Sequence, residues 1–207
     1  MRLVARLVIL APAPRGGKDL HHRCLALTIL MTGSESSAEN KFAPSDVMEI
    51  LNQHGWHTGE LSTAQSVWCE RAAALLGPQS ADRASLGSLL TLVFHYDARE
   101  ILAQVDSHVV LSRYAARDVL RQLALLLIDS APLTTERFRE VVEAMKSNLD
   151  IRGRELFHPL RLALAGRSGE GELDRVVLLL DGAASADFAA PVKPARQRII
   201  EFCSVLD

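Results

Sequence analysis

The stretch from Ile151 to Arg167 reads IRGRELFHPLRLALAGR, and its periodicity predicts a helix that carries most of the functional information in the chain. At 100° per residue, its larger apolar side chains share one arc. They are Leu156, Phe157, Leu160, Ala163 and Leu164. Three basic side chains, Arg154, His158 and Arg161, share another arc. We therefore predict an amphipathic helix with a basic stripe.

Two further residues set the shape of this helix. Gly166 stands where a helix C-terminus favours a left-handed residue, which glycine adopts without steric cost. Pro159 has no N–H to donate to the carbonyl of Glu155, so we expect it to kink the helix. A proline inside a helix with a one-sided basic face suggests a surface shaped for binding.

The composition is that of a globular protein. The chain has 207 residues, of which 48% are hydrophobic and 5% aromatic, so it can bury the core of one domain or of two small ones. The formal net charge is -2. A chain with this balance is not a basic nucleic-acid binder as a whole, and any contact with nucleic acid would come from a local patch.

The cysteines and the apolar runs exclude several classes of protein. Cys24, Cys69 and Cys203 are odd in number and far apart, which argues against a disulfide framework and against paired zinc ligands. We therefore expect reduced thiols in the cytoplasm, no metal ion and no cofactor. No apolar run approaches the roughly 20 residues that a helix needs to span a bilayer, so no membrane partner is expected.

Residues 1–40 differ from the rest of the chain. The apolar run Leu7–Ala11 follows basic residues and precedes Ala-Pro-Ala, which resembles a targeting segment with a small-residue cleavage site. Alternatively, translation begins at Met31, which a polar segment follows. We favour the second interpretation because the apolar run is short. Residues 1–40 are then an N-terminal extension that is disordered or not translated.

From Phe42 onward the pattern is helical almost throughout, with no strand-like alternation of any length. Capping signals mark several helix starts. These are Ser62 with Gln65, Asp97 with Glu100, and Thr134 or Thr135. We predict helices over about 44–54, 62–76, 83–94, 97–105, 109–128, 134–145, 151–166, 173–180 and 194–206, with a Gly, Ala and Ser link after the eighth.

The apolar positions of these helices predict the core and the fold class. The expected core residues are Val47, Ile50, Leu51, Val67, Trp68, Ala72, Leu75, Leu86, Leu89, Leu90, Val93, Leu111, Ala115, Val119, Leu120, Leu123, Leu127, Phe138, Val141, Val142 and Met145. The longest segment, 109–128, should form the central helix of the fold. We predict an all-α protein of two small helical subdomains, 41–106 and 107–207, divided by a slight change of composition near Ser107.

Two segments resemble a known family. Gly153–Arg167, followed by Gly171–Leu173 and Val176–Gly182, is similar to the C-terminal end of bacterial glutamyl-tRNA synthetases, which carries a Pro-Leu-Arg-x-Ala-Leu-Thr-Gly block, a loop and a leucine-rich helix. The spacing from Pro159 to Leu173 needs no gap. Upstream, Leu86–Asp97 looks like the family's leucine-to-aromatic segment. The resemblance covers about 70–205 and is strongest over 150–182.

The resemblance implies an all-helical anticodon-binding domain of the class I synthetase type. Arg161 corresponds to the arginine that reaches the anticodon bases, and Leu173 to the leucine that lies alongside them. Arg83 is the candidate for a further anticodon-reading arginine, although it stands one residue closer to Leu86 than in the family. Ala165 replaces a threonine. The local basic patch adds the candidate tRNA-binding residues Arg152, Arg154, His158 and Arg167.

The sequence contains no recognisable catalytic site. The His-x-Gly-His signature of class I synthetases and their mobile lysine-serine loop are both missing. His54-Gly-Trp-His57 has the glycine in the wrong place, and we interpret it as a helix end at Gly55 with surface histidines. Lys146-Ser147 lies inside a helical pattern and is expected to be ordinary surface.

These observations favour a stand-alone tRNA-binding protein that recognises a glutamate-type anticodon and acts with a separately encoded catalytic synthetase subunit. No DNA partner is expected. The alternative is a helical protein-interaction module derived from the same domain that has lost tRNA binding, which the acidic net charge and the departures at Arg83 and Ala165 favour. A third interpretation is a fragment of a broken gene.

Overall fold

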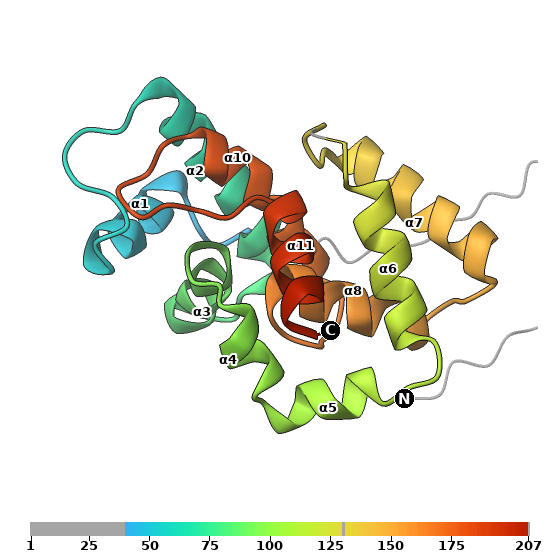
Figure 1. Ribbon diagram of the computed structural model, residues 1–207. Helices are drawn as coiled ribbons and strands as arrows, with labels where there is room; N and C mark the ends of the chain where they lie inside the picture. Colours follow the sequence, from blue (N-terminus) through green and yellow to red (C-terminus); the bar gives the residue numbers. More distant parts are fainter. Residues whose placement is uncertain (1–39, 130, 207) are drawn as a thin grey trace, which may run out of the picture. The chain divides into compact units, whose positions relative to one another are not determined.

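The computed structural model describes residues 40–129 and 131–206, which form eleven α-helices, one short 3-10 helix and no strand (Figure 1). The α-helices are α1 Pro44–Gln53, α2 Thr63–Leu76, α3 Arg83–Phe94, α4 Ala98–Leu102, α5 Val105–Leu111, α6 Ala116–Leu126, α7 Thr135–Leu149, α8 Arg154–Ala165, α9 Glu172–Val177, α10 Leu180–Ser185 and α11 Ala195–Leu206. The predicted all-α class is confirmed. The expectations for residues 1–39, including the targeting segment and the start at Met31, lie outside the described residues.

Local capping explains the helix starts that were predicted correctly. The backbone N–H of Ser62 donates to Gln65 Oε1, and the N–H of Gln65 donates to Ser62 Oγ, at 2.9 and 3.3 Å. Thr134, rather than Thr135, accepts the N–H of Arg137 at 3.2 Å. Each of these bonds satisfies a first-turn donor that has no partner inside its helix.

The capping box predicted at Asp97 is only half formed. Asp97 accepts the N–H groups of Arg99 and Glu100, and these bonds hold the pKa of its carboxyl below the usual value. The carboxylate of Glu100 lies instead 3.0 Å from Nε2 of His95. Only the half of the capping box that Asp97 provides is therefore formed.

The prediction of one continuous central helix over 109–128 is wrong. The chain turns at residues 112–115, between α5 and α6, and α7 is the longest helix of the described residues. Ser112 Oγ donates to the carbonyl of Val109 at 3.0 Å, a local bond that competes with helix continuation. A four-residue interruption is about one helical turn, so the apolar spacing continues across it and hides the break.

Two other element predictions need correction. The helix predicted over 173–180 is divided into α9 and α10, and the predicted Gly, Ala and Ser link belongs to α10. In α2, Val67 is 58% exposed, and Cys69 and Leu76 are buried in its place. The burial of the other core positions agrees with prediction except at Leu75, Leu111 and Phe138, which are partly buried.

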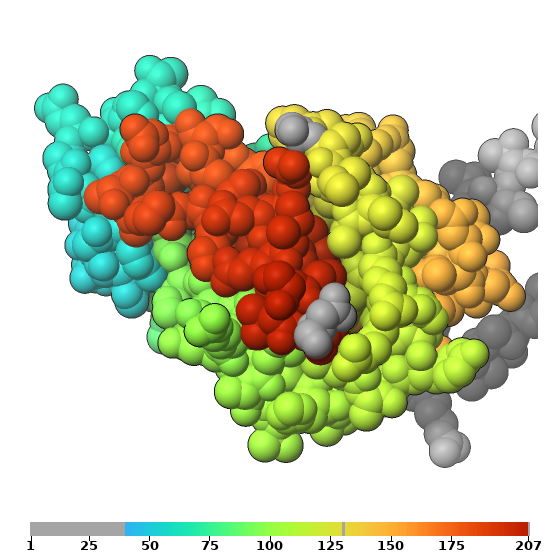
Figure 2. Space-filling model, viewed as in Figure 1, coloured from blue at the N-terminus to red at the C-terminus, as the bar shows by residue number. Residues whose placement is uncertain are grey.

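The last helix, α11, contacts α4, α6 and α8. Figure 2 shows it in red between the green helices α3 to α5 and the yellow-green α6. Helices from both sides of residue 106 contribute to one hydrophobic core cluster. The division into subdomains at 41–106 and 107–207 stays a prediction.

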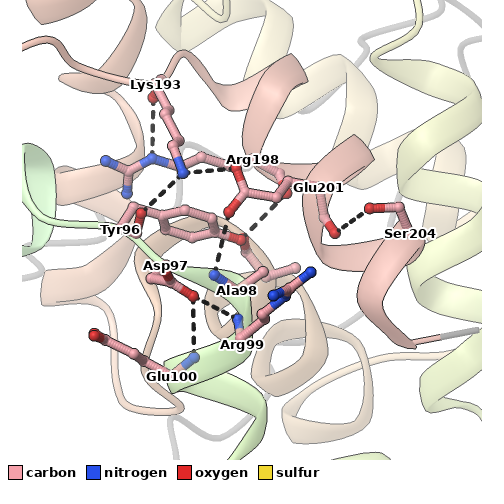
Figure 3. A network of polar contacts seen from close by, with 10 residues as sticks. Tyr96, Asp97, Ala98, Arg99, Glu100, Lys193, Arg198, Glu201 and Ser204 are labelled. Atoms are coloured by element: carbon pink, nitrogen blue, oxygen red, sulfur yellow. Dashed lines mark hydrogen bonds and ion pairs between the residues drawn. The ribbon is translucent and has the colours of Figure 1, made fainter.

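Arg198 of α11 is fully buried and joins three parts of the chain (Figure 3). Its guanidinium donates to the carbonyls of Leu92 and Val93 in α3 and of Leu164 in α8. These carbonyls lie in the last turns of their helices, where no intrahelical donor remains and the helix dipole is negative. Burial lowers the pKa of Arg198 to about 10, so the side chain stays charged at neutral pH. Arg198 thus serves as a shared C-terminal cap for α3 and α8.

Tyr96 covers this guanidinium. Its ring centre lies 4.6 Å from Cζ of Arg198, and its hydroxyl donates to the carbonyl of Ala163 at 2.6 Å. Burial raises the pKa of the Tyr96 hydroxyl well above the usual value, so it remains a donor. Lys193 closes the cluster by pairing with Glu201 at 2.7 Å.

None of the helices in the described part of the chain is long and apolar enough to cross a bilayer.

Candidate functional site

Helix α8 is the element on which the candidate site is built. Its N-cap, Gly153, has a φ of 60° and provides no side chain to cap the first turn. The helix continues through Pro159, whose predicted kink stays a prediction, and ends before Gly166. Gly166 has a φ of 79°, and its N–H donates to the carbonyl of Leu162 at 3.0 Å. The left-handed C-terminal glycine is confirmed.

Arg161 is the most completely bonded residue of the predicted basic stripe. Nε and Nη2 donate to the two carboxylate oxygens of Asp174, both at 2.7 Å, and Nη1 donates to the carbonyl of Gly169 at 2.6 Å. Cζ lies 4.9 Å from the ring centre of Phe157. Only 9% of the side chain is exposed. The guanidinium therefore ties the loop 166–171 and the start of α9 to α8.

The loop between α8 and α9 runs back along α8. Its Gly169 meets Arg161, and Oε1 of its Glu170 lies 3.6 Å from Nη2 of Arg154, near the first turn of α8. Leu173 is buried below the loop. A Cβ at Gly169 would come within 2.8 Å of the Leu173 side chain. Glycine at position 169 thus lets the loop pack closely on Leu173, and a larger residue there would require the Leu173 side chain to shift.

The basic stripe is open only at its N-terminal end. Arg154 has 76% of its side chain exposed, whereas His158 is partly buried and Arg161 is buried. Nδ1 of His158 lies 3.3 Å from Nη1 of Arg113, in the turn after α5. Burial, and then the charges of Arg113, Arg154 and Arg161, lower the pKa of His158. A neutral ring can accept the Arg113 hydrogen bond at Nδ1.

The remaining predicted residues lie at three places outside the stripe. Arg152 is exposed just before α8, and Arg167 is exposed just after it. Arg167 lines a hollow of about 340 Å³ that α3, α4 and the end of α8 enclose. Arg83, at the start of α3, pairs with Glu49 at 2.8 Å, and its Nη2 is buried without a hydrogen-bond partner. The structure therefore brings Arg154, His158, Arg161 and Leu173 together and leaves Arg83 on the α1–α3 side.

The hollow beside Arg83 and the hollow beside Arg167 share two lining residues. Ser88 and Thr91 of α3 belong to both. Arg83 is thus connected to the end of α8 along one face of α3.

Sequence reasoning missed the partners that organise the site. Asp174 is 13 residues from Arg161, and Arg113 is 45 residues from His158. Neither separation has a helical or strand periodicity that could have revealed the contact. The prediction that His57 lies on the surface is also wrong. His57 is buried, and its Nε2 lies 3.1 Å from the carbonyl of Gly59. In residues 40–129 and 131–206 no group of three metal-ligating side chains is assembled.

The described residues thus define an all-helical unit in which an arginine clamps a loop against a helix with a basic N-terminal end. Comparison with known proteins gives two relatives. The chain is 30% identical over 117 residues to glutamate–tRNA ligase 2 of Syntrophus aciditrophicus (strain SB), which is 56% of this chain and 23% of that protein. It is 26% identical over 121 residues to the glutamate–tRNA ligase of Geobacillus thermodenitrificans (strain NG80-2), which is 58% of this chain and 24% of that protein.

The chain is therefore partially homologous to glutamate–tRNA ligases, and its all-helical structure is consistent with their C-terminal anticodon-binding domain. It spans about a quarter of the length of these curated relatives. No protein-family model matches the chain, and no solved structure gives a significant match.

Proposed function

We propose that this protein binds tRNA of the glutamate type at the anticodon, through the open end of α8 and the loop 166–171. The observation that carries the proposal is the partial homology to two glutamate–tRNA ligases over more than half of the chain. Unpaired anticodon bases are the part of a tRNA most open to side-chain readout. A cluster of guanidinium groups on a rigid helix suits such a target.

In this proposal the candidate residues divide into two roles. Arg152, Arg154 and Arg167 are exposed and would meet phosphates and base edges. Arg161 and Leu173 are buried and would shape the loop that faces the RNA. Arg161 retains one N–H on each Nη atom beyond its bonds to Asp174 and Gly169, which is the donor capacity left for a base.

No aminoacylation chemistry is assigned to the described residues. The catalytic half of a class I synthetase is built on a parallel sheet with nucleotide-binding loops, and residues 40–129 and 131–206 form helices only. We propose that a catalytic synthetase subunit supplies the chemistry.

A mobility-shift titration with glutamate and glutamine tRNA transcripts tests the proposal. We expect binding at low salt that weakens linearly on a logarithmic salt scale, because each neutralised phosphate releases counterions. The double variant Arg154→Ala/Arg167→Ala should lower the affinity and flatten the salt slope by about two. Arg71→Ala, an exposed arginine on α2, serves as the matched control and should change neither. Undetectable binding of the wild-type protein at low salt would overturn the proposal.

A second function, protein interaction without RNA, is favoured by two observations. Asp174 neutralises Arg161, and Val105 and Val109 are exposed one turn apart on α5, at 76% and 55%. Purification under low-salt conditions discriminates between the two functions. Bound tRNA in the purified protein supports the first, whereas RNA-free protein whose association with a defined partner is lost in Val105→Ser/Val109→Ser supports the second.

A further inference from the structure

The turn between α5 and α6 presents a fully exposed aromatic ring. Tyr114 has a relative exposure of 101%. Among the described residues it makes no ring contact and no side-chain hydrogen bond, so its ring faces are open to solvent. A tyrosine ring is a large, rigid surface that usually gains energy from partial burial. Its complete exposure points to a partner outside this chain.

Backbone hydrogen bonds fix the turn that carries Tyr114. The N–H of Arg113 donates to the carbonyl of Val110, and the N–H of Ala116 donates to the carbonyl of Arg113. Ala115 and Ala116, which follow Tyr114, are buried. The turn is therefore anchored on both sides of the exposed ring, so little backbone conformational entropy would be lost when the ring stacks on a ligand.

Arg113, beside the tyrosine, carries a charge that no carboxylate neutralises within the described residues. Its side chain makes one polar contact among these residues, the 3.3 Å approach of Nη1 to Nδ1 of His158. Besides Arg113, the charged groups that act on that histidine are Arg154, Arg161 and Glu170. Arg154 and Arg161 have the carboxylates of Glu170 and Asp174 as partners, so an anion at this position would offset the charge of Arg113.

We propose that Tyr114 and Arg113 form a further RNA contact, in which the Tyr114 ring stacks on an unpaired base and the Arg113 guanidinium binds a neighbouring phosphate. The inference rests on the proposed function and extends it to a part of the chain that the family resemblance does not assign. A ring next to an unpaired cation fits a nucleotide, which offers a π face and an anionic phosphate together.

The new contact continues the proposed interface. Figure 1 shows the α5–α6 turn beside the first residues of α8, and the Arg113–His158 contact joins the two elements. His158 and Arg154 are four residues apart and lie on the same face of α8. Arg154, His158, Arg113 and Tyr114 thus form one path from α8 to the turn.

A protein partner fits this surface less well. The apolar side chains of Val105 and Val109 precede the turn, and a protein that covered them together with Tyr114 would also cover Arg113. Burial of a charge without a partner is costly. RNA supplies the compensating charge itself. Association with a protein partner through Tyr114 would therefore overturn the inference.

The test uses the full chain and two probes, the glutamate tRNA transcript and a short single-stranded oligouridine. We expect Tyr114→Ala to weaken binding of both probes about 5- to 150-fold, which corresponds to the range for one base–aromatic stack. Tyr114→Phe and Tyr114→Trp should keep wild-type affinity because they keep the ring. Arg113→Ala should weaken binding and lower the salt slope by about one, whereas Tyr114→Ala should leave the slope unchanged.

The outcomes separate this inference from the proposed function. Wild-type binding of tRNA that Arg154→Ala/Arg167→Ala weakens and Tyr114→Ala does not overturns the Tyr114 contact alone. Absence of tRNA binding together with oligouridine binding that depends on Tyr114 overturns the proposed tRNA function and supports the contact. Absence of binding to both probes overturns both. Self-association in sedimentation that only Tyr114→Ala abolishes overturns the Tyr114 contact alone. Thermal unfolding of each variant confirms that it is folded.

Discussion

Arg161 and Asp174 form a two-point ion pair in which both N–O distances are 2.7 Å. Parallel N–H groups on a planar guanidinium match the two oxygens of a carboxylate, so the pair fixes orientation as well as distance. Because the third bond goes to the carbonyl of Gly169, one side chain holds both ends of the segment between α8 and α9. The arginine that the family resemblance assigns to base reading therefore also organises the structure around it.

The first prediction concerns the stability that this pair contributes. Arg161→Ala leaves the Asp174 carboxylate and the Gly169 carbonyl without their donor in a largely buried place. We expect the free energy of unfolding to fall by about 2–4 kcal/mol. Arg161→Lys should recover less than half of this loss, because an ammonium group lacks the fork geometry. Urea denaturation measures both, and full recovery in the lysine variant would contradict the two-point geometry.

The second prediction separates charge from shape at the same pair. Asp174→Asn keeps an oxygen that accepts from Arg161 but removes the negative charge. We expect a loss of stability of about 1–2 kcal/mol and a gain in tRNA affinity, because the local charge becomes more positive. Titrations of wild type and variant at one salt concentration measure the gain. A lower affinity in a folded Asp174→Asn protein would show that loop order matters more than charge.

The third prediction is a pH dependence of stability. The pKa of His158 is lowered from 6.5, so between this value and the lowered pKa the unfolded chain binds more protons than the folded one. The stability contribution of the neutral ring is present above 6.5 and is lost as the pH falls through the lowered pKa. We expect the urea midpoint to fall between about pH 7 and about pH 5. His158→Asn should reduce the fall, and an unchanged fall would assign it to other groups.

The fourth prediction tests the buried arginine of α11. Arg198→Ala removes the donor for three carbonyls of α3 and α8 and should cost about 3 kcal/mol or more. Arg196, two residues earlier on the same helix, is exposed and provides the control. Arg196→Ala should change the free energy of unfolding by no more than about 0.5 kcal/mol. Similar losses in both variants would show that α11 propensity, rather than carbonyl capping, is measured.

Local signals explain which parts of the fold could be predicted from the sequence. The bounds of α3 and the caps at Ser62 and Thr134 were correct because a few adjacent residues determine them. The prediction of one helix over 109–128 was wrong because the break at Ser112 occupies about one helical turn and leaves the apolar period intact. Helix existence could thus be predicted, but the continuity between two helices could not.

The candidate site was only partly accessible to sequence reasoning. The basic arc of α8 could be found from its spacing, but the burial of Arg161 depends on Asp174 in another helix. Arg198 gave no signal at all, because its acceptors are backbone carbonyls up to 106 residues away. A charged residue on a predicted helix is usually taken as solvent-exposed. Both arginines are exceptions because their partners come from distant segments.

Because Arg198 caps α3 and α8 from the final helix, synthesis of the chain imposes an order on its folding. Leu92, Val93 and Leu164 are made first, and their carbonyls have no guanidinium until residue 198 has left the ribosome. The nascent chain can form α3 and α8 earlier, but their last turns then lack this shared cap. Premature termination before Pro194 would therefore yield a polypeptide that lacks α11 and the Arg198 cap. We expect such a polypeptide to be degraded readily by proteases.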